Sequence, residues 1–379
     1  MKTLYPVPEI AIGAGRIDQI AGDVAALPGS PARVLLVIDR FLSQSGLADR
    51  VQTALKPREM TLWDEFAGEP TAAQIDAAAA LARKNKVEAV IGIGGGSALD
   101  VAKLVASIVA EPASVERYAF CANPLPSKSL PAICVPTTAG TGSETTLTAI
   151  FANAAGKKAW AWGPELAATK AILDPTLTTS LPAHLTAATG IDALVHAIES
   201  CTNANRFEAN DQTAHAAIRL VARHLPAAVA NPADLAAREG MLVASCYAGI
   251  AINNCGTAIA HNIAHALGSI GKVHHGRAAG LGLRASLPWS LPASTSAFAA
   301  VADAMGGPHD ASALPDLVDC LIRKVGMKVA LADELPGITP DRLAAEMALP
   351  ENAAMRKSSA RASTDDDLRD LARLVLSAT

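Results

Sequence analysis

The chain has 379 residues, half of them hydrophobic, which is enough for two globular domains with large cores. Its formal net charge of −4 provides no basic field to hold a phosphate backbone, so we expect no nucleic-acid partner. We expect a cytoplasmic protein without disulfides or a membrane span, because its six cysteines lie far apart and no uninterrupted apolar stretch reaches about 18 residues.

The first half of the chain alternates short β-branched runs with alanine-rich helical patterns. Its opening stretch, MKTLYPVPEI, has no apolar run before its prolines and predicts neither a signal peptide nor a transit peptide. Strand followed by helix followed by strand predicts a parallel sheet with crossover helices. The expected elements are strands at Arg33–Asp39, Val87–Gly94 and Leu130–Thr138, and helices at Thr71–Lys84, where Thr71 is the cap, and at Ala98–Ala110.

After Ala171–Pro182 the strand signals nearly stop, and helical patterns continue to the C-terminus. We therefore predict an α/β domain over residues 1–180 and an all-helical domain over residues 181–379. Two segments of the second half, Met305–Asp310 and Pro350–Thr364, are rich in Gly, Pro, Ser and charge and are predicted to be loops.

A glycine-rich turn joins the second predicted strand to its helix in GIGGGSALDVAK, Gly92–Lys103. Glycines let the backbone approach a ligand closely, and the start of a helix favours an anion, so a diphosphate fits here; the alternative is a plain tight turn. The turn is not the usual Rossmann fingerprint, because Ser97 takes the place of the last glycine. PTTAGTGSETT, Pro136–Thr146, predicts a second ligand loop at the same edge of the sheet.

Asp39 ends the first predicted strand. A carboxylate there can accept the ribose hydroxyls of an adenosine and would repel a 2′-phosphate, which indicates NAD rather than NADP. The alternative is that Asp39 only caps the following helix.

Four of the nine histidines lie within the eighteen residues Ile259–Gly276. Asp192 and His196 are four residues apart, as are His261 and His265, so each pair projects from one face of a helix, and the turn HHG brings His275 nearby. One carboxylate with imidazoles suits Fe(II) or Zn(II). Spacing alone does not decide which of the four histidines from 261 to 275 bind the metal, and any one of them can instead be an ordinary hydrogen-bonded residue.

Five motifs, GGGSALDVAK, PTTAGTGSE, GIDALVHAIES, AHNIAHALG and HHG, together resemble the iron-containing (group III) alcohol dehydrogenases in order and spacing. The resemblance implies the dehydroquinate synthase-like fold, with a dinucleotide-binding α/β domain followed by an all-helical metal and substrate domain. It implies an NAD-dependent alcohol dehydrogenase or aldehyde reductase, usually oligomeric, that acts on a small primary alcohol or aldehyde. His265 would line the site as a proton relay, and the implied metal ligands are Asp192, His196, His261 and His275.

The resemblance also implies a cofactor site. The diphosphate would lie at Gly95, Gly96, Ser97 and Asp100, and the nicotinamide nucleotide would contact Thr137, Thr138, Thr146 and Lys158. Asp39 matches the family position that favours NAD.

Some residues depart from the family pattern, among them Glu69, Arg277 and Arg284. Arg277 follows His275 by two residues, and its guanidinium needs an anionic partner. That partner can be a protein acid or the cofactor diphosphate, or the side chain can turn to solvent; alternatively, Arg277 recognises an anionic group on the substrate. The alternative functions are a maleylacetate-reductase-like or dehydroquinate-synthase-like enzyme and a catalytically silent scaffold.

Overall fold

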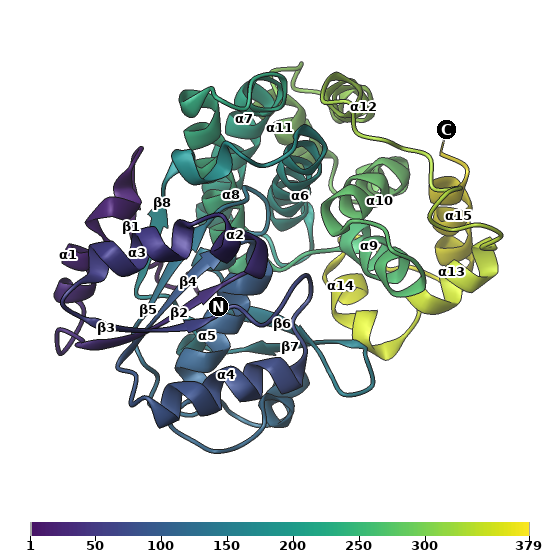
Figure 1. Cartoon of the computed structure of the whole chain (residues 1–379). Helices are drawn as coiled ribbons and strands as arrows, with labels where there is room; N and C mark the ends of the chain where they lie inside the picture. The colour runs from purple at the N-terminus through teal and green to yellow at the C-terminus, as the bar shows by residue number, and fades with distance from the viewer. Residues whose placement is uncertain (1, 379) are drawn as a thin grey trace. The chain divides into compact units, whose positions relative to one another are not determined.

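The computed structural model describes residues 2–378. Two compact units divide the chain (Figure 1), here called the sheet unit and the helical unit. The sheet unit comprises Pro6–Thr138 and Gly142–Thr179. The helical unit comprises residues 180–378 together with residues 2–5 and 139–141.

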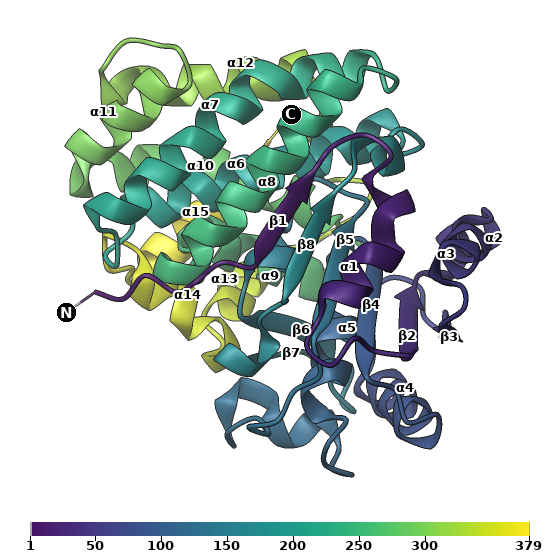
Figure 2. The same cartoon turned by 90° about the vertical axis from the view of Figure 1, so that its left-hand side faces the viewer.

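The sheet unit is built on six parallel strands (Figure 2). Strand β2 shows why the sheet is covered on both faces: Leu35 and Val37 pack into one hydrophobic cluster, while Val34, Leu36 and Ile38 pack into another. In order across the sheet the strands are β1 (Glu9–Ile12), β8 (Lys170–Leu173), β5 (Ala132–Pro136), β4 (Ala89–Gly94), β2 (Arg33–Ile38) and β3 (Glu59–Trp63).

Helices cover both faces of this sheet. Residues of α4 (Ala72–Lys84) and α5 (Gly96–Ile108) belong to the first cluster, and residues of α1 (Ile20–Ala26) and α3 (Leu47–Leu55) to the second. A short helix α2 (Arg40–Gln44) follows β2 directly. The α/β class is therefore confirmed, and Thr71 begins α4 with a capping box, as its position predicts.

Five strands of the sheet unit were not predicted. They are β1, β3, β8 and the antiparallel hairpin of β6 (Thr148–Ala152) and β7 (Lys158–Trp162). The hairpin buries Ala149, Phe151, Ala159 and Ala161 in alternation, but alanine is a weak strand signal, so the period of two is hard to see in the sequence.

The helical unit contains ten α-helices among the described residues. Three long helices, α6 (Ala183–Thr202), α7 (Glu208–Ala230) and α8 (Leu235–Cys255), supply much of its core. The others are α9 (Ile259–Ile270), α10 (His275–Ser290), α11 (Thr295–Ala304), α12 (Leu314–Lys324), α13 (Pro340–Met347), α14 (Ala353–Ser358) and α15 (Asp365–Leu376).

Two glycines of α10 permit the close helix contacts that this unit needs. A Cβ on Gly276 would lie 2.3 Å from the Ala188 carbonyl oxygen of α6, and one on Gly282 would lie 2.4 Å from the Ala260 carbonyl oxygen of α9. Real Cβ atoms are not found at such distances, so only glycine allows α10 to pack this closely against both neighbours. The helices that carry the predicted metal ligands are thereby held together.

The loop predictions have mixed outcomes. Met305–Asp310 lies between α11 and the next short helical turn, as predicted. The prediction for Pro350–Thr364 was wrong over its first part, where a 3-10 turn at Pro350–Asn352 leads into α14. Burial of Asn352 and Met355 stabilises these turns, and composition alone does not reveal that burial.

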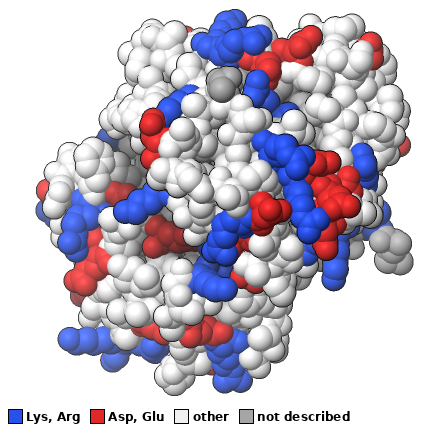
Figure 3. All heavy atoms as spheres, turned by 90° about the vertical axis from the view of Figure 1, so that its right-hand side faces the viewer, with Lys and Arg blue, Asp and Glu red and all other residues white. Residues whose placement is uncertain are grey.

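Two surface properties bear on possible partners. Helix α8 is long and apolar enough to cross a membrane, but 61% of its most apolar window is buried within the protein, as is common in core helices of soluble proteins. On the face shown in Figure 3, basic and acidic side chains are interspersed. Two ion pairs of α15, Arg369–Asp366 and Arg373–Asp370, join side chains of opposite charge.

Candidate active site

Three helices bring the predicted metal-binding side chains together. Asp192 and His196 lie one turn apart on α6, and His261 and His265 lie one turn apart on α9. His275 is the first residue of α10. The adjacent Gly276 packs against α6, where its Cβ position is 2.9 Å from the Asp192 Cβ, so the glycine of HHG is what allows His275 to reach the site.

The donor atoms form one compact cluster. Asp192, His196, His261 and His275 each offer one ligand atom, and these four atoms lie within 4.8 Å of one another. Asp192 Oδ1 is 3.7 Å from His261 Nε2 and 3.8 Å from His275 Nε2. The rings of His196 and His261 stack with their centroids 4.5 Å apart. His265 is outside this ligand group, and its ring centroid is 5.6 Å from that of His275.

Further contacts orient two of these imidazoles. His261 Nδ1 lies 2.6 Å from Glu199 Oε2, and His196 Nδ1 lies 3.2 Å from the Gly140 carbonyl oxygen. In both rings the other nitrogen, Nε2, is thereby available as a lone-pair donor.

The electrostatics of the cluster favour a positive charge. Burial raises the pKa of Asp192, but the charges of His196 and His275 and the neighbouring His261 outweigh burial, so this pKa lies well below its usual range. Burial lowers the pKa of His261, but Glu199 and Asp192 outweigh it and raise the pKa to about 9. Two buried carboxylates therefore hold a cation, and a divalent metal can take that role in place of a proton.

A metal ion fits the cluster. Asp192 Oδ1 and His261 Nε2 are both buried, and neither has a hydrogen-bond partner in the described part of the chain. Buried polar atoms without partners are costly and call for an explanation. One oxygen and three nitrogens are a suitable donor set for Fe(II) or Zn(II), and ligand bonds of about 2.0–2.2 Å place donor atoms roughly 3–4.4 Å apart, similar to the observed cluster.

The predicted cofactor residues gather at the carboxyl ends of the parallel strands. The chain goes from β2 outward to β3 and then returns to β4 on the other side of β2, so the strand order reverses between β2 and β4. Open α/β sheets bind ligands at such a reversal. Asp39 follows β2 and caps α2 by accepting from the Leu42 N–H at 3.1 Å, while Gly95 follows β4 and begins α5 without a side-chain cap.

Asp100 and Thr146 belong to a buried network that ties α5 to the loop after β5. Asp100 accepts from the Ser143 hydroxyl at 2.5 Å and from the Ile150 N–H at 3.0 Å. Lys103 donates to the carbonyl oxygens of Ser143, Thr146 and Thr148 and lies 3.4 Å from Asp100 Oδ1. The contacts of Asp100 therefore support a role in holding this loop rather than direct contact with the diphosphate.

The other predicted cofactor residues lie close to the glycine turn or on the hairpin. The Thr137 N–H donates to the Gly94 carbonyl oxygen at 2.9 Å, and Thr138 Oγ1 is 3.4 Å from the position that a Cβ on Gly95 would occupy. Lys158 begins β7 and lies 3.7 Å from Glu69. Gly96 and Ser97 form the first turn of α5.

The guanidinium of Arg277 forms hydrogen bonds with other parts of the protein. Its guanidinium donates to Glu334 at 2.7 Å, to the Lys328 carbonyl oxygen at 2.6 Å and to the Ala330 carbonyl oxygen. These contacts favour the alternative in which Arg277 pairs with a protein acid. The hypothesis that it recognises an anionic substrate loses its support, because a two-residue separation from His275 does not fix the direction of the side chain.

Comparison with known proteins assigns the family. The sequence matches the family described as "Iron-containing alcohol dehydrogenase" over residues 7–175 and "Fe-containing alcohol dehydrogenase family, C-terminal" over residues 186–374. The chain belongs to the iron-containing alcohol dehydrogenases. Its activity is thus that of an NAD-dependent oxidoreductase that interconverts alcohols and aldehydes, and the family's metal is iron.

Individual relatives illustrate the range of this family. The chain is 37% identical over 310 residues to a long-chain-alcohol dehydrogenase of Geobacillus thermodenitrificans, covering 81% of this chain and 78% of that protein. It is 34% identical over 306 residues to a sulfoacetaldehyde reductase of Bilophila wadsworthia, covering 80% and 78%. The crystal structure of a sulfoacetaldehyde reductase from Bifidobacterium kashiwanohense in complex with NAD+ superimposes with a TM-score of 0.92 at 32% identity, covering 100% and 99%.

Three buried charged residues near these iron-containing alcohol dehydrogenase motifs were not singled out from the sequence: Glu199, Lys103 and Glu144. Glu199 had a visible signal, since positions 192, 196 and 199 share one face of a helix. Lys103 likewise follows Asp100 by three residues on α5. Glu144 is buried, and neither of its carboxyl oxygens has a hydrogen-bond partner among the described residues; nothing in its sequence context indicates that.

Proposed function

We propose that Asp192, His196, His261 and His275 hold the catalytic iron, and that Zn(II) is compatible with the same ligands. The observation that carries this assignment is the buried cluster in which Asp192 Oδ1 and His261 Nε2 have no hydrogen-bond partner within the described part of the chain. Residues 181–379 would then be the metal and substrate domain, and residues 1–180 the dinucleotide-binding domain.

For the cofactor, the proposal assigns the diphosphate to the backbone of Gly95, Gly96 and Ser97 at the start of α5, where the helix dipole favours an anion. Thr137, Thr138, Thr146 and Lys158 contact the nicotinamide nucleotide. Asp39 accepts the ribose hydroxyls and sets the preference for NAD. Asp100 and Lys103 act through the loop that they hold.

When bound, the metal supplies a Lewis acid for the substrate oxygen and NAD(H) supplies the hydride acceptor or donor. The chain's own residues prepare that chemistry. Asp192 and Glu199 offset the charge of a divalent ion in a buried site, and Glu199 holds His261 in one orientation. His265, which is half-buried one turn after His261, exchanges a proton with solvent at its ring during turnover.

The substrate is a small alcohol or aldehyde, and a primary alcohol is the finer proposal. Relatives are named for long-chain alcohols, sulfoacetaldehyde and 1,3-propanediol, so family membership leaves the chain length and charge of the substrate open. The ligand cluster contains all four donors, which argues against the maleylacetate-reductase-like and scaffold alternatives. The match to the iron-containing alcohol dehydrogenase family over both halves of the chain argues against the dehydroquinate-synthase-like alternative.

Further parts of the proposal concern partners and location. A homo-oligomer is expected for this family, and the formal net charge of −4 supports the expectation that the protein has no nucleic-acid partner. A cytoplasmic location without a membrane partner is also part of the proposal, and the six cysteines, all free within the described residues, are consistent with that compartment.

The test is reconstitution of metal-free protein with Fe(II) or Zn(II), followed by assay of NAD reduction with short, branched, diol and acidic alcohols. We expect NADH absorbance with at least one primary alcohol and aldehyde reduction in reverse. Turnover that does not depend on added metal would refute the metal assignment. Turnover in the carbonyl-reducing direction alone would favour the maleylacetate-reductase-like alternative.

A further inference from the structure

Glu199 is a buried carboxylate directly behind the metal cluster. It lies on α6 one turn beyond His196, and 3% of its surface is exposed. It is not one of the four residues whose donor atoms converge. Its oxygens instead accept from His261 Nδ1 at 2.6 Å, from the Ala258 N–H at 2.8 Å and from the Ala260 N–H at 2.6 Å.

Two of these contacts fix the start of α9. The residue at the N-cap position of this helix, Ala258, has no side chain that can accept from the first turn. The first N–H groups of a helix need acceptors, and Glu199 supplies them from another helix. The turn that is held in this way carries His261.

The third contact fixes the protonation of His261. An ionised carboxylate only accepts hydrogen bonds, so the proton on His261 is at Nδ1. In the neutral ring, the form that binds a metal, the lone pair is then on Nε2, the nitrogen that lies 3.7 Å from Asp192 Oδ1 and has no hydrogen-bond partner among residues 2–378. By contrast, His196 Nδ1 lies against a neutral carbonyl oxygen at 3.2 Å.

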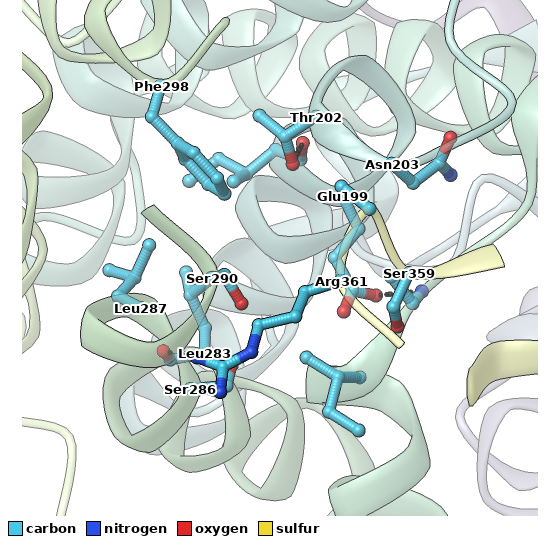
Figure 4. A pocket seen from close by; sticks show the side chains of 14 residues that line it. Glu199, Thr202, Asn203, Leu283, Ser286, Leu287, Ser290, Phe298, Ser359 and Arg361 are labelled. Carbon is cyan, nitrogen blue, oxygen red and sulfur yellow. Dashed lines mark hydrogen bonds between the residues drawn. The ribbon is translucent and has the colours of Figure 1, made fainter. Parts of the chain in front are cut away.

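Among the described residues, the hollow beside Glu199 supplies no cation that binds its carboxylate. Figure 4 shows Glu199 lining a small hollow together with Thr202, Ser286 and Ser359. The hollow has about 20 Å³ of space for water, which is enough for one or two molecules. Arg361 also lines it, but its guanidinium donates to the Trp289 carbonyl oxygen and to Asp367.

We propose that Glu199 is a positioning residue for the metal: it fixes the tautomer and orientation of His261 and, through its negative charge, strengthens His261 Nε2 as a metal donor. This inference rests on the proposed ligand set. Carboxylates that hold a metal-bound histidine in this way contribute about 10- to 100-fold to metal affinity in other proteins.

The test measures Co(II) binding to metal-free protein by competition with a chelator, together with the visible absorption bands of bound Co(II). We expect Glu199→Gln to bind Co(II) about 10- to 100-fold more weakly and to shift those bands, because the amide is uncharged and brings a donor toward backbone N–H groups. Ser286→Ala is the matched control: this buried serine lines the same hollow, and its loss should leave both readouts unchanged.

Glu199→Asp keeps the charge but shortens the side chain, so it should weaken Co(II) binding by a smaller factor. If Glu199→Gln binds Co(II) as tightly as the wild type with the same bands, the inference is overturned, even if the protein unfolds at a lower temperature. A wild-type protein that binds no Co(II) would overturn the ligand set itself and this inference with it.

Discussion

The metal cluster and the cofactor loops are built from different parts of the chain. In the helical unit the proposed metal site is made of side chains: four donors converge, and two of their atoms are buried without hydrogen-bond partners among residues 2–378. In the sheet unit the proposed diphosphate site is mainly backbone, since Gly95 and Gly96 start α5 without a side-chain cap. A side-chain site should therefore fail when a side chain is removed, whereas a backbone site should fail when one is added.

The largest expected effect is the loss of a ligand in the helical unit. Replacing His261 with alanine removes the only proposed donor that is also held by Glu199. We expect metal affinity to fall by at least about 100-fold and activity to fall with it. Elemental analysis of purified protein and metal titration would measure this loss.

His265→Ala is the matched control for that experiment, because His265 lies one turn later on the same helix and outside the ligand group. It should keep the metal and lose rate. If His261→Ala keeps its full metal content and full activity, the assignment of His261 as a metal ligand is wrong.

In the sheet unit, where the proposed cofactor site is mainly backbone, Glu144 is a buried side chain with an unusual environment. Only 1% of its surface is exposed, neither carboxyl oxygen has a partner in the described structure, and burial raises its pKa to about 7 despite the nearby charge of Lys103. A raised carboxyl pKa means that the folded state holds a proton that the unfolded state releases. The contribution of protonated Glu144 to the free energy of unfolding is therefore fully present below about pH 4.5 and is lost as the pH rises through about 7.

We accordingly compare the free energy of unfolding of Glu144→Gln with that of the wild type at about pH 5 and at about pH 8. The difference should shift in favour of the variant by about 2–3 kcal/mol between these two pH values. Denaturant midpoints of the metal-free, cofactor-free protein at both pH values would measure this gain. Glu59→Gln, at an exposed position of β3, is the control and should show none. Parallel pH dependence in the wild type and Glu144→Gln would mean that Glu144 is ionised and compensated in the fold.

Gly95→Ala tests the backbone side of the comparison directly. The added Cβ would lie 3.4 Å from Thr138 Oγ1 and clash with no backbone atom, so the protein should fold. The methyl group would stand where the diphosphate is proposed to approach, so we expect NADH to bind roughly tenfold more weakly in a fluorescence titration, with unchanged metal content.

Two other glycines serve as comparisons. At Gly94 the same change brings Cβ to 2.7 Å from the Ala98 Cβ at a φ of +151°, and should destabilise the fold instead. At Gly22 nothing lies within 4 Å, and alanine should be harmless. NADH affinity that is equal in Gly95→Ala and Gly22→Ala would place the diphosphate elsewhere.

The same contrast explains what the sequence could reveal. Helical periodicity makes the pairs Asp192–His196 and His261–His265 visible, and the buried β2 and β4 runs predict parallel strands. The choice of His261 and His275 as ligands came only from the resemblance to the family. Arg277 shows the limit: proximity to His275 in sequence could not predict that its guanidinium reaches Glu334 and two distant carbonyl oxygens. Such partners come from segments about fifty residues away, and only the fold brings them near.

The smallest expected effect concerns Asp39, whose side chain has one contact with the backbone and one proposed role in the cofactor site. This residue caps α2 through the Leu42 N–H and is also proposed to repel a 2′-phosphate by its charge. Asp39→Ser keeps an oxygen that can cap the helix and removes the charge, whereas Asp39→Ala removes both. If the charge sets the preference, both variants should narrow the ratio of kcat/KM with NAD to that with NADP by about the same factor, roughly tenfold, and only Asp39→Ala should lose about 1 kcal/mol of stability. A ratio that is unchanged in Asp39→Ser but narrowed in Asp39→Ala would show that helix capping, not charge, supports the NAD site.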